Sequence, residues 1–280
     1  MKRWIDDDFD PEKIRLSGQC FRIKRLDERR YLFVTGSQLL ILSICDQKNE
    51  ALCLELSCDA GSWEKIWRPY FDLDRSYRVL RAEESEKSPF IKESMQLGKG
   101  LRILRQDPWE TLVSFILSQR KSLPAIARCV ELLCRKFGRK VMEIPGGNDV
   151  YTFPSAMELL SASEGELASC GLGYRLPYLQ DAARRCASGE LSMESLASLP
   201  DRDLLEALCQ VKGVGLKVAS CVALFAYGRT GLAPVDVWIG RAIEEHFAGQ
   251  SPFPAFGERA GIIQQYIFYA MKWGRPGQEE

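Results

Sequence analysis

The residues whose types and spacing could do chemistry are gathered in one glycine-rich stretch. Gly213 and Gly215 lack a Cβ, so a turn at these positions can adopt positive φ, and a bulky group can approach its backbone. The amides ahead of the following helix favour an anion, because they lack helical partners and lie at the positive end of the dipole. Lys217 falls in the first turn of that helix, where the local positive potential should disfavour the charged form of its amine. The stretch is therefore a candidate phosphate cradle with a lysine beside it.

Helices are expected to position this stretch on both sides. Apolar residues recur at helical spacing before the glycines and again after them, at Leu204, Leu205, Leu208 and Val211 and at Val218, Ala219, Val222 and Ala223. Asp236 follows Pro234 and precedes apolar-periodic residues, so it fits the N-cap of a further helix. A simpler interpretation stays open at this point: Gly-x-Gly is often only a tight connection, and a helical lysine usually lies on a solvated face.

Length and composition indicate a globular protein. The chain has 280 residues, 46% of them hydrophobic, which is enough for one large or two ordinary domains. No apolar run reaches about 18 residues, so we expect no membrane span. The N-terminus turns acidic at Asp6 without an apolar segment, so we expect no signal peptide and a cytoplasmic or, in a prokaryote, nucleoid location.

Cysteine and histidine usage argues against several kinds of site. Ten cysteines without a CxxC pair fit reduced, buried thiols better than a disulfide framework. His246 is the only histidine, so a histidine-based metal site or catalytic triad cannot be built. We therefore expect no metal and no cofactor.

Charge is balanced overall but uneven along the chain. Residues 99–140 hold ten basic and three acidic side chains, whereas residues 1–98 hold 17 basic and 18 acidic ones. A local basic face could neutralise phosphates within a protein of zero net charge. The alternative is that these helices merely carry solvated charges.

Two domains of different type are expected in chain order. Leu52, Leu54 and Leu56 alternate with other residues, and two β-rich runs flank the turn at residues 35–37, which predicts a hairpin. From Trp63 the period becomes helical, and Asp107-Pro108-Trp109-Glu110 predicts a capping box that opens a helix. We therefore place an antiparallel β domain with flanking helices at 1–98 and a helical domain at 99–280.

Two later segments carry further candidate residues. On the loop 171–175, Tyr174 and Arg175 could wedge into a duplex and hold a displaced base, although a core tyrosine and a surface arginine are equally compatible with the pattern. In the last helix, Gln264 and Phe268 are four residues apart and hence share a face.

Taken together, these blocks resemble the 8-oxoguanine DNA glycosylases of the helix-hairpin-helix superfamily, and the likeness covers nearly the whole chain. The matching blocks, in order, are Ser17-Gly18-Gln19-Cys20-Phe21-Arg22, Tyr70-Phe71-Asp72-Leu73-Asp74, Leu104-Arg105-Gln106-Asp107-Pro108, Gly171-Leu172-Gly173-Tyr174-Arg175, Gly213-Val214-Gly215-Leu216-Lys217-Val218-Ala219 and Pro234-Val235-Asp236-Val237. The resemblance implies an α+β protein, with an antiparallel β domain followed by an all-helical glycosylase domain. It also implies a monomer that acts on double-stranded DNA containing oxidised guanine and not on membranes.

The resemblance further implies a reaction and its residues. Lys217 would attack C1′ of an extruded nucleotide as the neutral amine, release the base and leave a Schiff base through which the strand is cut. Asp236 would stabilise the developing oxocarbenium charge and orient the amine. The carbonyl of Gly18 would accept from N7–H of 8-oxoguanine and repel the N7 lone pair of guanine. Gln264 would bind the Watson–Crick edge, and Phe268 and Cys221 would sandwich the base.

Three departures from the better-known members concern the opposite base and the pocket. The chain has Arg120-Lys121-Ser122 in place of a run of asparagines, Ala125 in place of an arginine and Trp238 in place of a histidine. The first two positions contact the orphaned cytosine in those members. We therefore predict that Arg120 donates to cytosine or to another base and that the opposite-base choice is relaxed, while Trp238 reshapes the pocket near Asp236.

Other readings of the same motif remain. An endonuclease III type enzyme usually carries four clustered cysteines after the hairpin, and no cysteine follows Cys221. A monofunctional alkyl-base glycosylase keeps the aspartate but usually lacks the lysine, and it leaves the strand intact. A non-catalytic helix-hairpin-helix DNA-binding protein is the alternative from another class, against which Lys217 and Asp236 together argue.

Overall fold

A computed structural model describes residues 1–144 and 149–274 of the chain. By their internal contacts they fall into two compact units, each built from separate stretches of sequence. Unit 1 comprises Met1–Phe33, Leu40–Arg105 and Gly228–Glu280, and unit 2 comprises Val34–Leu39 and Gln106–Tyr227. The division into domains at 1–98 and 99–280 stays a prediction.

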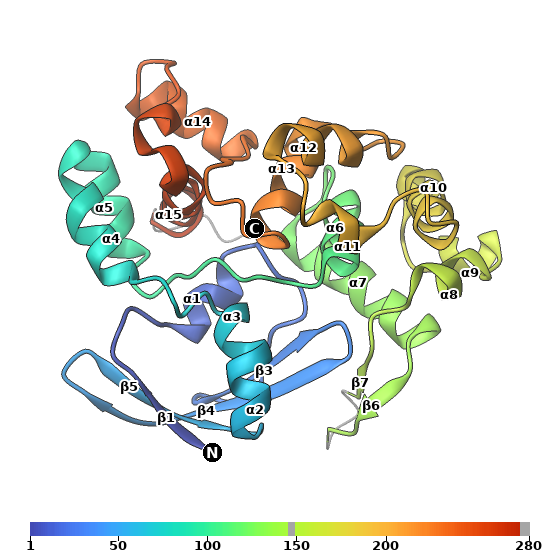
Figure 1. Cartoon of the computed structure of the whole chain (residues 1–280), viewed down its shortest axis with the longest axis horizontal. Helices are drawn as coiled ribbons and strands as arrows, with labels where there is room; N and C mark the ends of the chain where they lie inside the picture. Colours follow the sequence, from blue (N-terminus) through green and yellow to red (C-terminus); the bar gives the residue numbers. More distant parts are fainter. Residues whose placement is uncertain (145–148, 275–280) are drawn as a thin grey trace. The chain divides into compact units, whose positions relative to one another are not determined.

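Unit 1 contains a five-stranded sheet, which confirms the predicted antiparallel β region (Figure 1). In spatial order the strands are β1 (Lys2–Ile5), β5 (Ala51–Leu56), β4 (Gln38–Lys48), β3 (Arg30–Thr35) and β2 (Lys24–Arg25). The pairs β1–β5, β5–β4 and β3–β2 are antiparallel. Gly36, with a φ of 54°, lies in the turn of the predicted hairpin between β3 and β4.

Aromatic side chains dominate the core of unit 1. Phe71, which is fully buried, makes edge-to-face contacts with Phe33 of β3 and with Tyr70, at centroid separations of 5.0 and 5.1 Å. Such pairs stabilise beyond the area they bury. Through these contacts, the helical segment predicted from Trp63 onward packs against the sheet. The N-terminal helices and helical turns of unit 1 are α1 (Pro11–Leu16), α2 (Ala60–Ser62), the π-helical η1 (Trp63–Trp67), α3 (Arg68–Tyr70), α4 (Tyr77–Glu84), the 3-10 turn η2 (Ser85–Lys87) and α5 (Pro89–Leu97).

The C-terminal part of unit 1 is helical and is built around one buried helix. Its elements are α14 (Val237–His246), the 3-10 segment η4 (Phe253–Arg259) and α15 (Ala260–Trp273). All residues of α15 up to Met271 are buried, because the helix packs against both α5 and α14. Gly98 permits the close approach, since a Cβ there would lie 2.5 Å from the ring of Tyr266. The predicted last helix is thereby confirmed.

Unit 2 is almost entirely helical (Figure 1). Its helices are α6 (Pro108–Leu117), α7 (Leu123–Phe137), α8 (Ala156–Leu160), α9 (Glu164–Ala168), α10 (Leu176–Ala187), α11 (Met193–Leu196), α12 (Asp201–Cys209) and α13 (Leu216–Phe225), with the 3-10 turn η3 (Gly173–Arg175) and the short strands β6 (Lys140–Met142) and β7 (Val150–Tyr151). The buried helix α13 packs against α6 and α12. The predicted fold class, a β region together with a helical region, is confirmed.

The capping box predicted at the start of α6 is wrong in one half. Asp107 accepts from the amide of Glu110 at 2.8 Å, as an N-cap should. The Glu110 carboxylate instead accepts from the amide of Gly36 at 2.9 Å, and the Asp107 amide donates to the Thr35 hydroxyl at 3.0 Å. The start of α6 is therefore tied to the tip of the β3–β4 hairpin, within unit 2.

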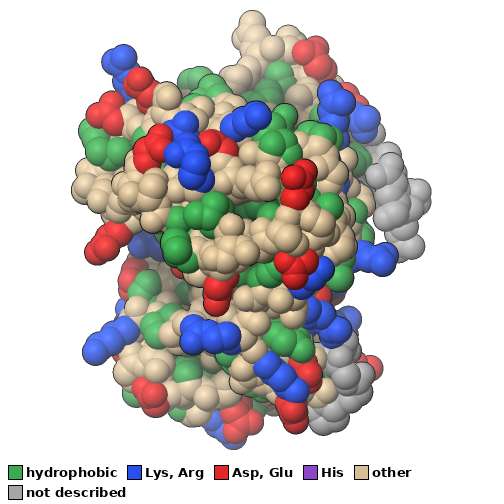
Figure 2. Space-filling model, turned by 90° about the vertical axis from the view of Figure 1, so that its right-hand side faces the viewer, with side chains coloured by type: hydrophobic (Ala, Val, Ile, Leu, Met, Phe, Trp, Pro, Cys, Tyr) green, Lys and Arg blue, Asp and Glu red, His purple; other side chains and the backbone are tan. Residues whose placement is uncertain are grey.

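The basic run over residues 99–140 is divided between the two units. Arg102 is 1% exposed in unit 1 and donates to the carbonyl of Phe71 at 2.8 Å. Other members of the run form ion pairs: Lys99 with Glu50, Arg105 with Asp72, Arg135 with Glu131, and Lys140 with Glu143 and Asp149. Basic and acidic side chains are interspersed on the face in Figure 2. The run is divided between two units, and half of its ten basic side chains are buried or ion-paired, so the basic face stays a prediction.

Two predictions about residue chemistry are confirmed within the described ranges. The ten cysteines form no disulfide with one another, and six of them are buried. Over the same ranges no helix combines the length and the apolar character that a membrane span needs. His246 stacks on Phe90, with ring centroids 3.6 Å apart.

Candidate active site

The glycine-rich stretch of unit 2 joins α12 to α13, as its spacing predicted. Gly213 has a φ of 77°, the left-handed conformation expected of it. Gly215 has a φ of −100° and a ψ of 179°, which is extended backbone open to any residue. Positive φ is therefore right for Gly213 and wrong for Gly215, which instead serves as the N-cap of α13.

The backbone at the start of α13 is open to an incoming group. A Cβ built on Gly215 would meet nothing within 4 Å, and the side chain of Leu216 is 65% exposed. The first helical hydrogen bond runs from the Ala219 amide to the Gly215 carbonyl at 3.0 Å, so the amides of residues 216–218 precede the helical ladder. These amides lie at the positive end of the helix dipole. The local geometry is that of an anion site.

Lys217 lies half-buried in the first turn of α13, against an aromatic ring. Its Nζ is 5.7 Å from the ring centroid of Phe115 in α6. That ring is stacked on Phe225, with centroids 5.5 Å apart and an interplanar angle of 14°. No carboxylate among the described residues of unit 2 forms an ion pair with Lys217. Its amine therefore faces an aromatic surface and is not engaged by an acid of its own unit.

Cys221 follows Lys217 by one turn of the same helix. It is 4% exposed, so it belongs to the buried side of α13. The spacing of four residues places it on the same side of the helix as Lys217.

The two loops that were expected to face DNA contact each other within unit 2. Arg175 donates from Nε to the carbonyl of Gln119 at 2.9 Å, and its Nη2 donates to the same oxygen. The Tyr174 hydroxyl donates to that carbonyl at 3.3 Å. Lys121 donates from Nζ to the carbonyl of Gly171 at 2.6 Å. The turn that follows α6 is thus bound to the loop 171–175.

Burial in these loops contradicts one of the two patterns that the sequence left open. Tyr174 is 49% exposed and Arg175 is only 5% exposed, so a core tyrosine with a surface arginine is not what the structure has. Arg120 is exposed and has a φ of 51°, a conformation that is uncommon outside glycine. Two side chains of the predicted DNA-binding set, Arg120 and Tyr174, therefore project to solvent.

Asp236 caps α14 in unit 1, as predicted. Its Oδ1 accepts from the Ile239 amide at 2.9 Å. The flanking Val235 and Val237 are 47% and 69% exposed, so apolar side chains surround the carboxylate at the surface of its unit. The second carboxylate oxygen is available for chemistry while the first holds the helix.

Trp238 lies in the first turn of α14, between two cations. The Lys272 Nζ is 4.9 Å from its ring centroid, and the Arg241 guanidinium carbon is 5.2 Å from it. Both distances are those of cation–π contacts. The indole therefore contacts one cation of its own helix and one of α15.

The Gly18 loop of unit 1 is fixed by two glutamines. Gly18 has a φ of 72°. The Gln265 amide donates to the carbonyl of Ser17 at 2.6 Å. Gln19 donates to the Ser17 hydroxyl at 2.8 Å and accepts from the Leu104 amide at 2.7 Å. The carbonyl of Gly18 is thus presented from a braced loop.

Gln264 and Phe268 lie one turn apart on α15, as predicted. They are 4% and 9% exposed. The Oε1 of Gln264 is buried and has no hydrogen-bond partner among the described residues. A buried acceptor without a donor is costly, which makes this oxygen a candidate for accepting a hydrogen bond from a ligand.

The predicted site residues form two sets. Unit 2 holds Lys217, Cys221, the hairpin glycines and the two loops, and unit 1 holds Asp236, Trp238, Gly18, Gln264 and Phe268. Sequence reasoning missed Gln119, Gln265 and Asp181, of which the last accepts from the Lys212 amide of the hairpin at 2.9 Å. Gln119 and Gln265 are sequence neighbours of residues that the sequence singled out, and Asp181 is not, but a side-chain hydrogen bond leaves no periodic signal in any of these cases.

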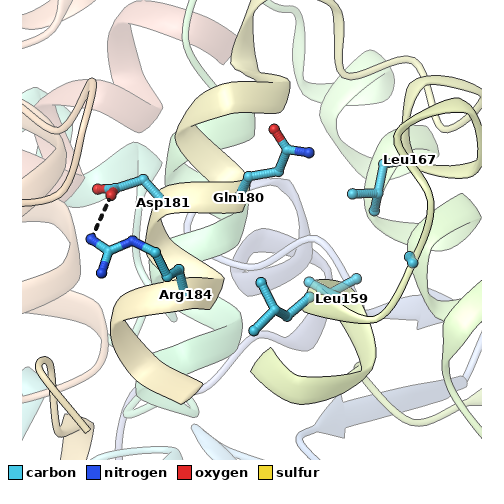
Figure 3. Close-up of a pocket in the computed structure, with 7 residues that line it drawn as sticks. Leu159, Leu167, Gln180, Asp181 and Arg184 are labelled. Carbon is cyan, nitrogen blue, oxygen red and sulfur yellow. Dashed lines mark hydrogen bonds and ion pairs between the residues drawn. The ribbon is translucent and has the colours of Figure 1, made fainter. Parts of the chain in front are cut away.

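A separate cavity lies among α8, α9 and α10 of unit 2 (Figure 3). Leu159 and Leu167 line its apolar side, while Gln180, Asp181 and Arg184 line it from α10. It contains none of the predicted site residues. Among residues 1–144 and 149–274, no cluster of three or more His, Cys, Asp or Glu side chains could hold a metal ion.

Two family models together match most of the chain. Residues 5–112 match the 8-oxoguanine DNA glycosylase N-terminal domain, and residues 113–253 match the HhH-GPD superfamily base excision DNA repair protein. A curated relative from Saccharomyces cerevisiae, an N-glycosylase/DNA lyase, is 34% identical over 254 residues. The match covers 82% of this chain and 66% of the yeast protein.

Two solved structures are similar over nearly their whole length. MBOgg1 in complex with a low affinity DNA ligand has a TM-score of 0.88 and 34% identity, covering 98% of this chain and 96% of that one. The 8-oxoguanine glycosylase/lyase of Clostridium acetobutylicum, in complex with double-stranded DNA containing cytosine opposite 8-oxoG, has a TM-score of 0.85 and 31% identity, covering 96% of both chains.

Proposed function

The chain belongs to the 8-oxoguanine DNA glycosylase/lyase family of the HhH-GPD superfamily, and on this premise we propose that it excises 8-oxoguanine from double-stranded DNA and cleaves the strand. The observation that carries the proposal is Lys217, held against Phe115 in the first turn of a helix whose N-terminus is open to a phosphate. In that position the lysine amine can act as a nucleophile next to a DNA backbone that the motif binds.

The reaction begins with extrusion of the damaged nucleotide, which costs a few kcal/mol. The amides at residues 216–218 offset this cost by holding a backbone phosphate of the lesion strand. The Lys217 lone pair then attacks C1′, and the bond from C1′ to the base breaks with its electron pair leaving on the base. Opening of the sugar ring gives a Schiff base. Loss of a C2′ proton then expels the 3′ phosphate by β-elimination, and water releases the lysine.

Asp236 acts by electrostatics. As the base departs, positive charge develops on the sugar, and a carboxylate fixed beforehand stabilises that charge without reorganising. The N-cap hydrogen bond from the Ile239 amide fixes the carboxylate through one oxygen and leaves the other oxygen for this role.

Recognition of the lesion rests on donors that normal guanine lacks. The N7–H of 8-oxoguanine donates to the Gly18 carbonyl, whereas the N7 lone pair of guanine repels it. The bracing of the loop by Gln19 and Gln265 keeps that carbonyl from turning away. Gln264, whose buried Oε1 lacks a partner among the described residues, accepts from the Watson–Crick edge. Phe268 and Cys221 sandwich the ring.

The remaining partners follow from the same reaction. The substrate is a duplex, in which Tyr174 and Arg120 contact the strand opposite the lesion; the exposure of both side chains supports this. The protein works as a monomer, in the cytoplasm or, in a prokaryote, at the nucleoid. Opposite-base choice is relaxed, because Arg120 replaces an asparagine that the better-known members use to read cytosine.

Borohydride trapping tests this function. A duplex with one 8-oxoguanine is incubated with wild type, Lys217→Gln and the control Lys212→Gln, which alters an exposed lysine of the same hairpin. We expect a covalent protein–DNA adduct and strand cleavage with wild type and the control, and neither with Lys217→Gln. Base release by Lys217→Gln at the wild-type rate would overturn the proposal. Base release by wild type with an intact strand and no adduct would point to a monofunctional glycosylase instead.

A further inference from the structure

The cavity among α8, α9 and α10 has no part in the proposed reaction, and its volume is about 250 Å³ (Figure 3). An apolar cavity of about 150 Å³ holds one benzene ring, so this cavity has room for two fused rings. Leu159 and Leu167, each 1% exposed, form its apolar wall. Leu160 and Arg184 also line it and are exposed, so a molecule can enter the cavity from solvent.

Gln180 offers this cavity a free carboxamide. Its side chain extends from α10 on the side of Leu167 (Figure 3). It is half-buried, and it makes no hydrogen bond to any other group that the structure describes. A carboxamide carries a donor next to an acceptor in one plane. It can therefore form two parallel hydrogen bonds with a flat molecule that carries an acceptor next to a donor, as glutamine does with the edge of adenine.

The charged groups at the cavity already balance one another. Asp181 accepts from Arg184 at 3.0 Å and from Arg185 at 2.9 Å. Both arginines also form ion pairs with Glu190, so two carboxylates neutralise two guanidinium groups. An ionic ligand would lose its hydration here without gaining a free counter-charge. The cavity therefore favours an uncharged ligand.

The same stretch of α10 supports the hairpin between α12 and α13. The amide of Lys212 donates to Oδ2 of Asp181 at 2.9 Å. Tyr178 packs closely against the turn, since a Cβ built on Gly213 would lie 2.3 Å from its ring. Asp181 therefore belongs both to the wall of the cavity and to the support of the hairpin.

We propose that the cavity binds a small, uncharged, flat heteroaromatic molecule with a cyclic amide, and that the bound molecule strengthens the binding of the hairpin to DNA through Asp181. The N–H and C=O of the cyclic amide pair with Gln180, and the rings pack on the apolar wall. The molecule also excludes water from the Asp181–Arg184 pair, which strengthens the hydrogen bonds that Asp181 accepts, including the one from Lys212. A hairpin ordered in advance has less freedom to lose on binding a duplex. This last step rests on the proposed function, because it requires the hairpin to bind DNA.

Two probe molecules test the site on the full chain. The first is 2-quinolone, a flat bicyclic cyclic amide, and the second is N-methyl-2-quinolone, in which the donor is blocked. We expect 2-quinolone to bind with a dissociation constant on the order of 1 mM, as for other molecules of about a dozen non-hydrogen atoms. The N-methyl form should bind several-fold more weakly, because it leaves one hydrogen bond unmade. Methyl NMR measures both affinities, and the shifts should fall on Leu159 and Leu167.

Three variants connect this preference to the cavity. Gln180→Leu keeps a similar size but removes both hydrogen bonds, so the two probes should bind it equally. Gln96→Leu, at an exposed position of α5, is the matched control and should keep the preference. Ala162→Phe fills the cavity and should abolish binding of both probes, and thermal unfolding checks that each variant is folded. Absence of 2-quinolone binding, equal binding of the two probes to wild type, or a preference that persists in Gln180→Leu would each overturn the site.

Fluorescence anisotropy with an uncleavable duplex tests the effect on DNA. Saturating 2-quinolone should tighten DNA binding about two- to three-fold, and by linkage the duplex should tighten 2-quinolone binding by the same factor. Asp181→Asn keeps the cavity but removes the charge, so the probe should still bind to it and should no longer change its affinity for DNA.

An unchanged DNA affinity in wild type, or the same gain in Asp181→Asn, would overturn the coupling. A DNA affinity that falls, and still falls in Gln180→Leu, would place the probe in the base pocket and overturn the inference as well. Borohydride trapping without a probe depends on none of these results, so the proposed function is tested separately.

Discussion

The ring of Tyr178 occupies the space that a side chain on Gly213 would need, because a Cβ built there would lie 2.3 Å from it. The same glycine has a φ of 77°. Gly213→Ala therefore forces a left-handed alanine against an aromatic ring. We expect the free energy of unfolding to fall by about 2–4 kcal/mol, from backbone strain together with overpacking. Urea unfolding measures this loss, and a variant as stable as wild type would show that the turn has room to relax.

Gly215→Ala should leave the stability of the protein almost unchanged but weaken its binding to DNA. The backbone of Gly215 is extended, and a Cβ there meets nothing within 4 Å. We expect unfolding to change by less than about 0.5 kcal/mol, as for an ordinary surface substitution. Binding to duplex DNA should nevertheless weaken about ten-fold or more, because the methyl group would occupy the approach of a phosphate to the amides of α13.

Fluorescence anisotropy with an uncleavable duplex measures that binding. Gly189→Ala, at another glycine whose Cβ would meet nothing within 4 Å, controls for loss of a glycine as such, although its φ of 78° adds strain. Unchanged DNA affinity in Gly215→Ala would remove the phosphate cradle from the mechanism.

Two substitutions of Asp236 should distinguish its role as a helix cap from its role in the reaction. Asp236→Asn keeps an oxygen that can accept from the Ile239 amide, whereas Asp236→Ala removes the N-cap. We expect Asp236→Ala to lose about 1 kcal/mol of stability and Asp236→Asn to lose only a few tenths. Both variants should lose activity by about a hundred-fold or more, since each lacks the charge that faces the sugar.

Thermal unfolding and single-turnover excision give the two readouts. If Asp236→Asn excised the base at the wild-type rate, the carboxylate would be only a helix cap.

The features that could be predicted from the sequence are those that depend on residues close together in the chain. Gly213 and the helices beside it follow from local periodicity, and Asp236 caps α14 because an aspartate before an apolar-periodic run has its acceptor three residues from a free amide. The last helix could be placed because its apolar residues recur over several turns. These patterns involve residues within one or two helical turns of each other, so they can be recognised without knowledge of the tertiary structure.

The features that could not be predicted depend on partners far apart in sequence. Glu110 binds an amide 74 residues away instead of closing its own capping box. Arg175 binds a carbonyl 56 residues away, which buries the side chain that the pattern suggested was on the surface or on DNA. Such bonds depend on which loops contact each other in the fold. The sequence pattern of one loop does not predict which other loop it will contact.

Asp181 should make the hairpin sensitive to acid. Burial raises the pKa of its carboxyl, but hydrogen bonds from the Lys212 amide and from Arg184 and Arg185 outweigh burial and bring the pKa below the ordinary 3.8 (Figure 3). A carboxylate with a lowered folded pKa stabilises the protein above its unfolded pKa, and this stability is lost as the pH falls through the folded value. Asp181→Asn should therefore be less stable than wild type at pH 7, and the difference should shrink below pH 3.8.

Urea unfolding of both proteins between pH 7 and pH 3 measures the difference, with Asp203→Asn on the exposed side of α12 as the control. A difference that stayed constant down to pH 3 would mean that the charge of Asp181 contributes nothing and that only its hydrogen-bond geometry matters.

Gln265 should control how well the protein tells damaged from normal guanine, although it lies beside and not within the predicted base pocket. Its amide holds the Ser17 carbonyl at 2.6 Å, so Gln265→Ala frees one of the two braces on the Gly18 loop. A loosened carbonyl can turn away from the N7 lone pair of guanine, which removes the penalty against the normal base. We expect the affinity ratio for duplexes with 8-oxoguanine and with guanine to fall about five- to ten-fold. The ratio is measured by anisotropy in the Lys217→Gln background, where no strand is cut, and Gln250→Ala at an exposed position is the control. If Gln265→Ala lowered the melting temperature but left the ratio intact, Gln19 alone would suffice to aim the carbonyl, and Gln265 would serve only to pack α15 against the loop.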